Sequence, residues 1–107
     1  MDILRLDRSF EKLRAIAKTM SANIDKAPKE LINANLQSIQ LICINSRAND
    51  ISEVPDENEI IVYDLLDSIN MYIINLLVTE QKVTLDNLVH IFNLSSKYYM
   101  LKDSLGV

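Results

Sequence analysis

Cys43 and His90 are the single cysteine and the single histidine of this 107-residue chain, so they are the first residues to weigh for chemistry. A catalytic thiol needs a neighbouring base, and a Cys43–His90 pair could provide one. Nothing in the surrounding sequence marks either residue as a nucleophile, and a metal site would need further paired ligands. The single glycine, Gly106, leaves no glycine-rich phosphate loop. We therefore predict that the chain is not an enzyme and holds no metal or cofactor.

A run of acidic residues near the middle of the chain is the second candidate. Within fifteen residues that contain no lysine or arginine, the carboxylates are Glu53, Asp56, Glu57, Glu59, Asp64 and Asp67. Such a cluster can form a docking face for a basic partner. The alternative is a solvated loop and helix start, because acidic side chains near a helix N-terminus interact favourably with the helix dipole. Asp56 and Glu59 also have the spacing of a capping box.

Amphipathic helices must position these residues. Apolar residues recur at alternating spacings of three and four, which predicts helices over residues 3–24, 28–47, 57–78 and 84–103. The scarcity of glycine and proline argues against a β-rich fold. We expect one all-α domain over residues 1–107, a compact bundle of four helices with antiparallel neighbours. The predicted core consists of Leu6, Phe10, Leu13, Ile39, Leu66, Ile69, Ile73, Leu76, Leu88 and Phe92.

Two local features refine this expectation. Thr84 can cap the last helix, with Val83 and Leu88 at the positions of a hydrophobic staple. The tyrosines are expected at the edge of the core with their hydroxyls in water. They are Tyr63, Tyr72, Tyr98 and Tyr99.

Residues 83–106 carry the one motif that suggests nucleic acid. The helical run from Leu85 to Phe92 is followed by Asn93, which tolerates the left-handed conformation of a tight turn, and then by Ser95, which can cap a new helix. This stretch resembles a helix-turn-helix, in particular the first such unit of AraC-type transcription regulators. The resemblance implies a recognition helix with the candidate DNA-binding residues Ser95, Ser96, Lys97, Met100 and Lys102.

A continuous last helix that merely closes the bundle is the alternative for this segment. Residues 80–107 hold three lysines and three acidic residues, so their net charge is zero. Binding of nucleic acid usually depends on phosphate neutralisation by a basic face. The charge of the segment therefore favours packing over DNA binding.

The first predicted helix carries an apolar seam of strict three-four spacing. The seam consists of Ile3, Leu6, Phe10, Leu13, Ala17, Met20 and Ile24. Such a seam can pair two copies of the chain, or it can pack inside one copy. A homodimer is therefore one of the expected partners, together with a different protein.

The cellular location follows from three observations. The lone Cys43 predicts a buried, reduced thiol in a reducing compartment. Charges from Asp2 onward interrupt the N-terminus too early for a secretory signal. Asp64 and Asp67 interrupt the most apolar stretch, so we expect no membrane span and no membrane partner. The prediction is a soluble cytoplasmic protein.

These patterns favour a small regulatory protein that acts by binding a protein partner, of the adaptor, inhibitor, immunity or chaperone type. Its partner-binding residues would be those of the acidic run. The alternative function is a helix-turn-helix DNA-binding regulator that uses residues 84–103.

Overall fold

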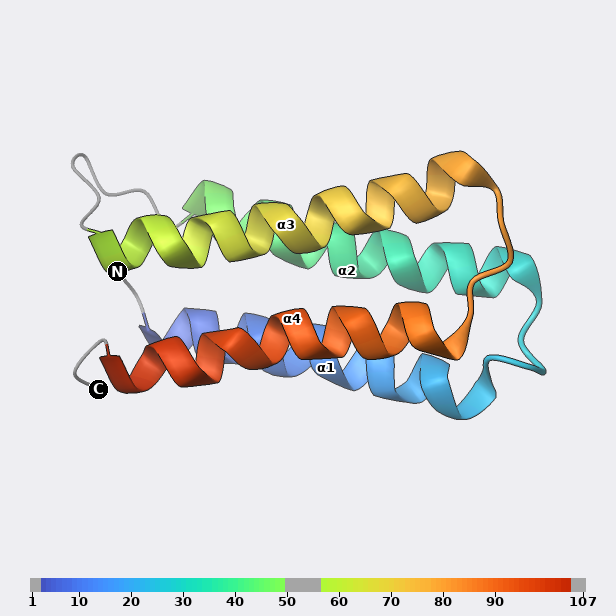
Figure 1. The fold of residues 1–107 in the computed structure, drawn as a ribbon, viewed down its shortest axis with the longest axis horizontal. Coiled ribbons are helices and arrows are strands. Elements are labelled where there is room, and N and C mark those ends of the chain that lie inside the picture. The colour runs from blue at the N-terminus through green and yellow to red at the C-terminus, as the bar shows by residue number, and fades with distance from the viewer. Residues whose placement is uncertain (1–2, 50–56, 105–107) are drawn as a thin grey trace.

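Four long helices run the length of the molecule in the computed structural model, which describes residues 3–49 and 57–104. They are α1 (Ile3–Asn23), α2 (Lys29–Asn49), α3 (Glu57–Thr79) and α4 (Leu85–Ser104). Successive helices run in opposite directions (Figure 1). No strand occurs in the described ranges. The predicted all-α fold is confirmed, and each predicted helix end lies within two residues of the observed one.

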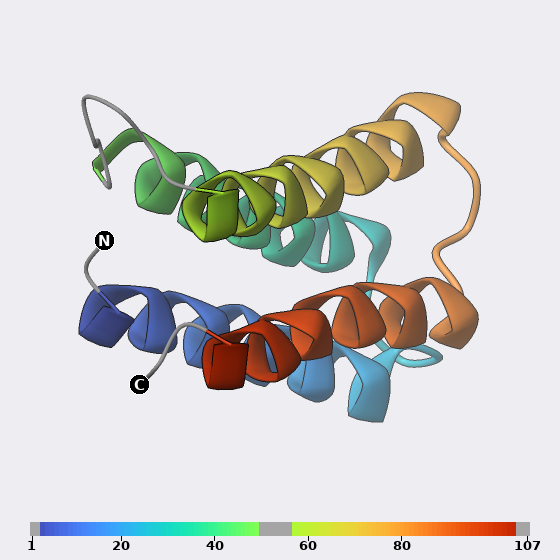
Figure 2. The same cartoon turned by 60° about the vertical axis from the view of Figure 1, so that its left-hand side comes forward.

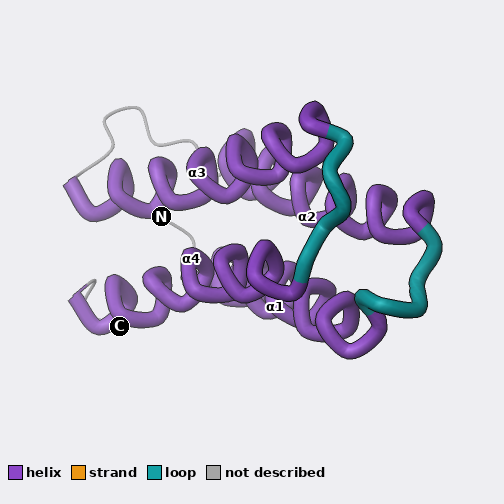
Figure 3. Tube along the Cα trace, turned by 45° about the vertical axis from the view of Figure 1, so that its right-hand side comes forward, coloured by secondary structure: helices purple, strands orange, loops and turns teal. Residues whose placement is uncertain are grey.

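The helices form a closed square. α1 and α3 each contact both α2 and α4, whereas the diagonal pairs do not approach each other within the described parts of the chain. α1 and α4 make one layer and α2 and α3 the other (Figure 2). The α1–α2 and α3–α4 loops meet at one end of the bundle (Figure 3). The square places the outer side of each helix on a separate edge of the molecule.

The core fills the centre of this square. Eight of the ten predicted core residues are fully buried, whereas Leu76 and Phe92 are half-buried at its edge. The guanidinium carbon of Arg14 lies 4.2 Å from the centroid of the Phe92 ring, so a charged group covers that ring. From Leu6 onward the seam residues of α1, and Ile24 just after it, are buried inside the chain, whereas the side chain of Ile3 lies outside the described residues. The described part of the seam therefore packs within one copy, and the homodimer stays a prediction.

Local signals fix the two ends of the α3–α4 loop. After α3 ends at Thr79, Glu80 adopts a φ of 54°, the left-handed conformation that commonly terminates helices. At the start of α4, the Asn87 N–H donates to Thr84 Oγ1 over 3.4 Å, and the Thr84 N–H donates to Asn87 Oδ1 over 2.9 Å. Val83 and Leu88 are both buried beneath this cap. The predicted cap is confirmed, and both residues of the predicted staple belong to the buried core.

Replacing Thr84 by alanine tests the cap. The exchange removes the hydroxyl that accepts from the first turn of α4, so we expect the free energy of unfolding to fall by about 1 kcal/mol. Urea denaturation followed by circular dichroism measures this loss. Thr84→Ser, which keeps the acceptor, is the matched control and should retain nearly all of the stability.

The helix-turn-helix form of the last segment is wrong, because α4 is continuous through Asn93. Fully buried side chains step by three and four along one face of α4, at Leu88, Ile91, Ser95 and Tyr98. This stripe passes the expected turn without a change of phase, so burial favours an unbroken helix. Ser95 does not cap a new helix. Its hydroxyl donates to the Phe92 carbonyl over 2.6 Å, inside the helix.

α3 is the one helix in the described ranges that is long and apolar enough to cross a membrane, judged by length and composition alone. The core helix of a soluble protein meets the same test. α3 packs against both α2 and α4 through its buried stripe. Burial in the bundle covers 33% of its most apolar window, so packing accounts for only part of its apolar character. The expectation that α3 spans no membrane stays a prediction.

Candidate functional site

The outer side of α3 presents part of the predicted acidic run. Glu57, Asp64 and Asp67 are exposed on it. Glu53 and Asp56 lie outside the described residues. No basic residue occurs in α3, so every charge along this helix is negative. The structure therefore brings three of the six predicted carboxylates together on one accessible helix.

Glu59 is the exception among the described carboxylates. It is buried, with 8% of its surface exposed, and it accepts a hydrogen bond from the Tyr63 hydroxyl over 3.3 Å. The guanidinium carbon of Arg47 lies 4.1 Å from the centroid of the Tyr63 ring. Glu59 precedes Val62 by three residues and so continues the buried stripe of α3. Its assignment to an exposed acidic face is wrong, because helix phase places it inward.

Apolar side chains accompany the exposed carboxylates of α3. Those that are more than a third exposed are Ile60, Ile61, Met71 and Val78. The sequence pattern alone did not distinguish them from the buried residues, because α3 is apolar on most sides. The signal was available, since these residues lie opposite the stripe of Val62, Leu66 and Ile69 on a helical projection. The outer side of α3 is therefore a mixed surface of apolar and acidic side chains, without a neutralising cation on the same helix.

Charge is distributed unevenly around the square. α1 carries five basic and two acidic residues, and α3 carries four acidic and no basic ones. These two helices are diagonally opposed. Arg8, Lys12 and Lys18 are exposed on α1, far from the carboxylates of α3. The basic and acidic edges therefore do not neutralise each other within one copy.

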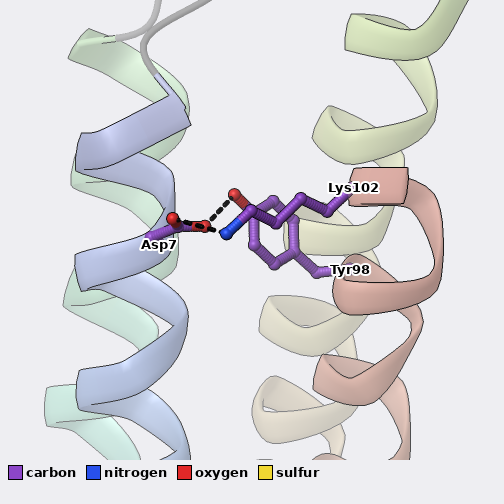
Figure 4. A network of polar contacts seen from close by, with 3 residues as sticks. All are labelled: Asp7, Tyr98 and Lys102. Atoms are coloured by element: carbon purple, nitrogen blue, oxygen red, sulfur yellow. Dashed lines mark hydrogen bonds and ion pairs between the residues drawn. The ribbon is translucent and has the colours of Figure 1, made fainter. Parts of the chain in front are cut away.

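One polar network ties α1 to α4 (Figure 4). The Tyr98 hydroxyl donates to Asp7 Oδ1 over 2.6 Å, and Lys102 Nζ lies 2.8 Å from Asp7 Oδ2. Burial of Asp7 acts to raise the pKa of its carboxyl, but the hydrogen bonds from Lys102 and Tyr98 outweigh this and lower it. The hydrogen bond to Asp7 raises the pKa of Lys102. The network joins two helices and is not an open site.

The predicted tyrosine positions hold only in part. Tyr63 and Tyr98 are buried, and the Tyr98 hydroxyl meets a carboxylate instead of water. Tyr72 and Tyr99 are half-buried, as a place at the core edge requires. The Tyr72 hydroxyl accepts a hydrogen bond from Asn87 over 2.9 Å. Tyr98 thus belongs to the core that holds α1 and α4 together.

The candidate DNA-binding residues do not form a common surface. Ser95 is fully buried, and Ser96 is half-buried and donates to the Phe92 carbonyl. Lys102 is engaged by Asp7. Lys97 and Met100 are exposed on the outer side of α4. Of the two lysines among these five residues, a continuous α4 therefore presents only Lys97 as exposed.

The structure separates the two residues that could have formed a nucleophilic pair. Cys43 is buried on α2, and burial, together with the nearby charge of Asp67, raises its pKa to about 12. His90 is exposed on α4, with its ring centroid 4.4 Å from that of Tyr72. α2 and α4 are diagonal helices, so the thiol and the imidazole do not meet. Among the described residues no cluster of three or more potential metal ligands occurs.

Comparison with known proteins identified no relative of this chain. No protein-family model matches the chain, and neither a curated protein nor a solved structure shows significant similarity to it.

Proposed function

We propose that this protein acts by binding a protein partner through the outer side of α3. The surface is defined by the exposed residues Glu57, Ile60, Ile61, Asp64, Asp67 and Met71, and we call it the acidic face. The partner contributes an amphipathic helix or strand in which apolar side chains are flanked by lysine or arginine. The protein works by occupying or presenting that segment, without catalysis.

The observation that carries the proposal is the pairing of apolar and acidic side chains on one exposed helix. Ile60 is 46% exposed and Met71 is 55% exposed, so each side chain has apolar surface to bury against a partner. The carboxylates beside them would steer a basic segment and suppress acidic competitors. The DNA-binding alternative has no comparable support, because α4 presents no basic face.

Charge reversal of the acidic face tests the proposal. The variant Glu57→Lys, Asp64→Lys and Asp67→Lys is titrated against a fluorescent synthetic helix with a leucine face and lysine flanks. Three exposed ion pairs at about 0.5 kcal/mol each predict roughly a tenfold loss of affinity. The affinity of the unmodified protein should also fall as salt rises, because exposed charges are screened.

A matched variant controls for net charge. Glu11→Lys, Asp25→Lys and Asp103→Lys change three exposed acidic residues away from α3. This variant should bind the lysine-flanked helix as the unmodified protein does, and a glutamate-flanked version of the helix should not bind either protein. An equal loss of affinity in both triple variants would show attraction by net charge alone and would refute the acidic face.

A further inference from the structure

A small cavity lies between α1 and α2, near the start of α1 and the end of α2. Its volume is about 190 Å³. The residues that line it are Arg5, Ser9, Lys12, Ile42, Asn45 and Ser46. All but Ile42 have side chains that can donate hydrogen bonds. The cavity is smaller than the roughly 300–1,000 Å³ of sites that enclose a drug-sized ligand, so it fits one small group.

The two serines of this cavity leave one donor unused. The Ser46 hydroxyl donates to Ser9 Oγ over 2.5 Å. Two hydroxyls have two hydrogens and this bond uses one of them, so the hydrogen of Ser9 remains to donate. Neither serine makes a further hydrogen bond within the described ranges. Because Ser9 is half-buried, an acceptor inside the cavity would supply the missing partner.

The charge around the cavity is positive. Arg5 and Lys12 line it, and none of its lining residues is acidic. Lys12 is exposed and forms no ion pair with any described residue. Glu11 precedes Lys12 but does not line the cavity, and Asp7 is engaged by Lys102. The acidic residue of α2 lies in its first turn, at the opposite end of that helix.

Side chains and not helix dipoles set this charge. α1 and α2 are antiparallel neighbours, so the N-terminal end of α1 lies beside the C-terminal end of α2 (Figure 1). The positive end of one dipole and the negative end of the other therefore oppose each other near the cavity. The two cationic side chains are left as the dominant charges.

We propose that this cavity binds a phosphoryl group, either as free phosphate or as the head of a small phosphomonoester. Lys12 and Arg5 neutralise its charge, and the Ser9 hydroxyl and the Asn45 amide donate to its oxygens. Donors from two helices suit a tetrahedral anion with several acceptor oxygens better than a flat carboxylate with two. The site lies between α1 and α2 and is independent of the acidic face on α3.

Titration of the isotope-labelled full chain with inorganic phosphate, followed by NMR at constant ionic strength, tests the site. The amide signals of Ser9, Lys12 and Asn45 should shift and saturate, with a Kd of roughly 1 mM. Acetate should bind at least about tenfold more weakly, because it carries less charge and fewer acceptor oxygens. Shifts that spread over the chain without saturation, or equal affinity for acetate, would overturn the proposal.

Substitutions at exposed positions locate the site without disturbing the core. Lys12→Gln should weaken phosphate binding about fivefold, because it removes one charge from the lining. Asn45→Asp replaces a donor by a carboxylate and should abolish the saturable shifts. The matched controls are Lys18→Gln on α1 and Asn93→Asp on α4, which make the same changes at exposed residues outside this lining. An equal loss in a variant and its control would refute the site.

A titration with glycerol phosphate then distinguishes the two sources of the phosphoryl group. Binding tighter than that of inorganic phosphate would support a phosphomonoester whose remainder lies along the groove between α1 and α2. Equal or weaker binding would support free phosphate as the ligand. In either case Asn45→Asp should abolish the binding, and a glycerol phosphate affinity that Asn45→Asp leaves unchanged would contradict the proposed cavity.

Discussion

Truncation of Tyr98 to alanine should lower the free energy of unfolding by about 3–5 kcal/mol. The side chain is fully buried between α1 and α4, and its ring stacks on Phe10 with centroids 4.1 Å apart. The substitution removes this stacking, leaves a cavity and takes away a donor to Asp7. Such a loss is a large fraction of the stability of a small domain. Urea denaturation followed by circular dichroism measures it, and a loss below about 1 kcal/mol would contradict the observed packing.

Tyr98→Phe separates the ring from the hydroxyl. The phenylalanine keeps the stacking on Phe10 and loses the hydrogen bond of 2.6 Å to Asp7. We expect a cost of about 1–2 kcal/mol, because a buried donor to a carboxylate contributes more than a neutral hydrogen bond. If Tyr98→Phe lowered the free energy of unfolding as much as Tyr98→Ala, the hydroxyl and not the ring packing would stabilise the contact between α1 and α4.

The difference in stability between the unmodified protein and Tyr98→Phe should depend on pH. Burial, followed by the hydrogen bond to Asp7, raises the pKa of Tyr98 in the folded chain. Above the ordinary tyrosine pKa, Tyr98 ionises in the unfolded chain before it ionises in the folded one. Its contribution to the free energy of unfolding is therefore complete below the ordinary pKa and is lost as pH rises through the pKa of the folded chain. The pKa of Asp7 is lowered, so its contribution is complete above its ordinary value and is lost as pH falls. The stability difference between the unmodified protein and Tyr98→Phe should therefore be largest near neutrality. A constant difference from acid to alkali would contradict this linkage.

Helix phase explains what the sequence could predict about this fold. The spacing of apolar residues determines which side of an amphipathic helix turns inward, so the four helices and most of their buried stripe follow from it. Leu66, Ile69 and Ile73 were predicted on these grounds and are fully buried. Phase does not say which helices become neighbours. The separation of Cys43 from His90 and the diagonal placement of α1 and α3 depend on the packing of the whole chain.

The errors arose where residue type was given more weight than phase. Glu59 continues the inward stripe of α3, but a carboxylate suggested an exposed position. Tyr98 continues the stripe of Leu88 and Ile91 on α4, but a turn at Asn93 interrupted that stripe in the helix-turn-helix interpretation. In both cases hydrogen bonds satisfy the polar atom, so the polar residue remains on the buried side. The same helical projection also identifies the exposed apolar residues of α2 and α3, because they lie on the side opposite the buried stripe.

Replacement of Asn93 by proline should lower the free energy of unfolding by about 3 kcal/mol or more, although its side chain is exposed. Asn93 lies in the interior of α4, which runs from Leu85 to Ser104. There a proline removes the N–H that donates to the carbonyl four residues earlier, and its ring collides with that carbonyl. A turn between two short helices would accept the same substitution at a much smaller cost. Circular dichroism should therefore show a lower unfolding midpoint and a loss of helical signal in Asn93→Pro.

Asn93→Ala completes the test, because it should change the free energy of unfolding with opposite sign in a continuous helix and in a left-handed turn. In a continuous helix, alanine has the higher propensity at an exposed position, and the variant should gain a few tenths of a kcal/mol. In a left-handed turn, alanine would lose about 1 kcal/mol relative to asparagine, because its Cβ crowds the backbone while the local hydrogen bonds of the amide are missing. A stabilised Asn93→Ala beside a strongly destabilised Asn93→Pro would mean that the segment from Leu85 to Ser104 acts as one rigid helix. Its buried stripe would then pack against α1. The segment would contain no separate recognition helix that could bind DNA.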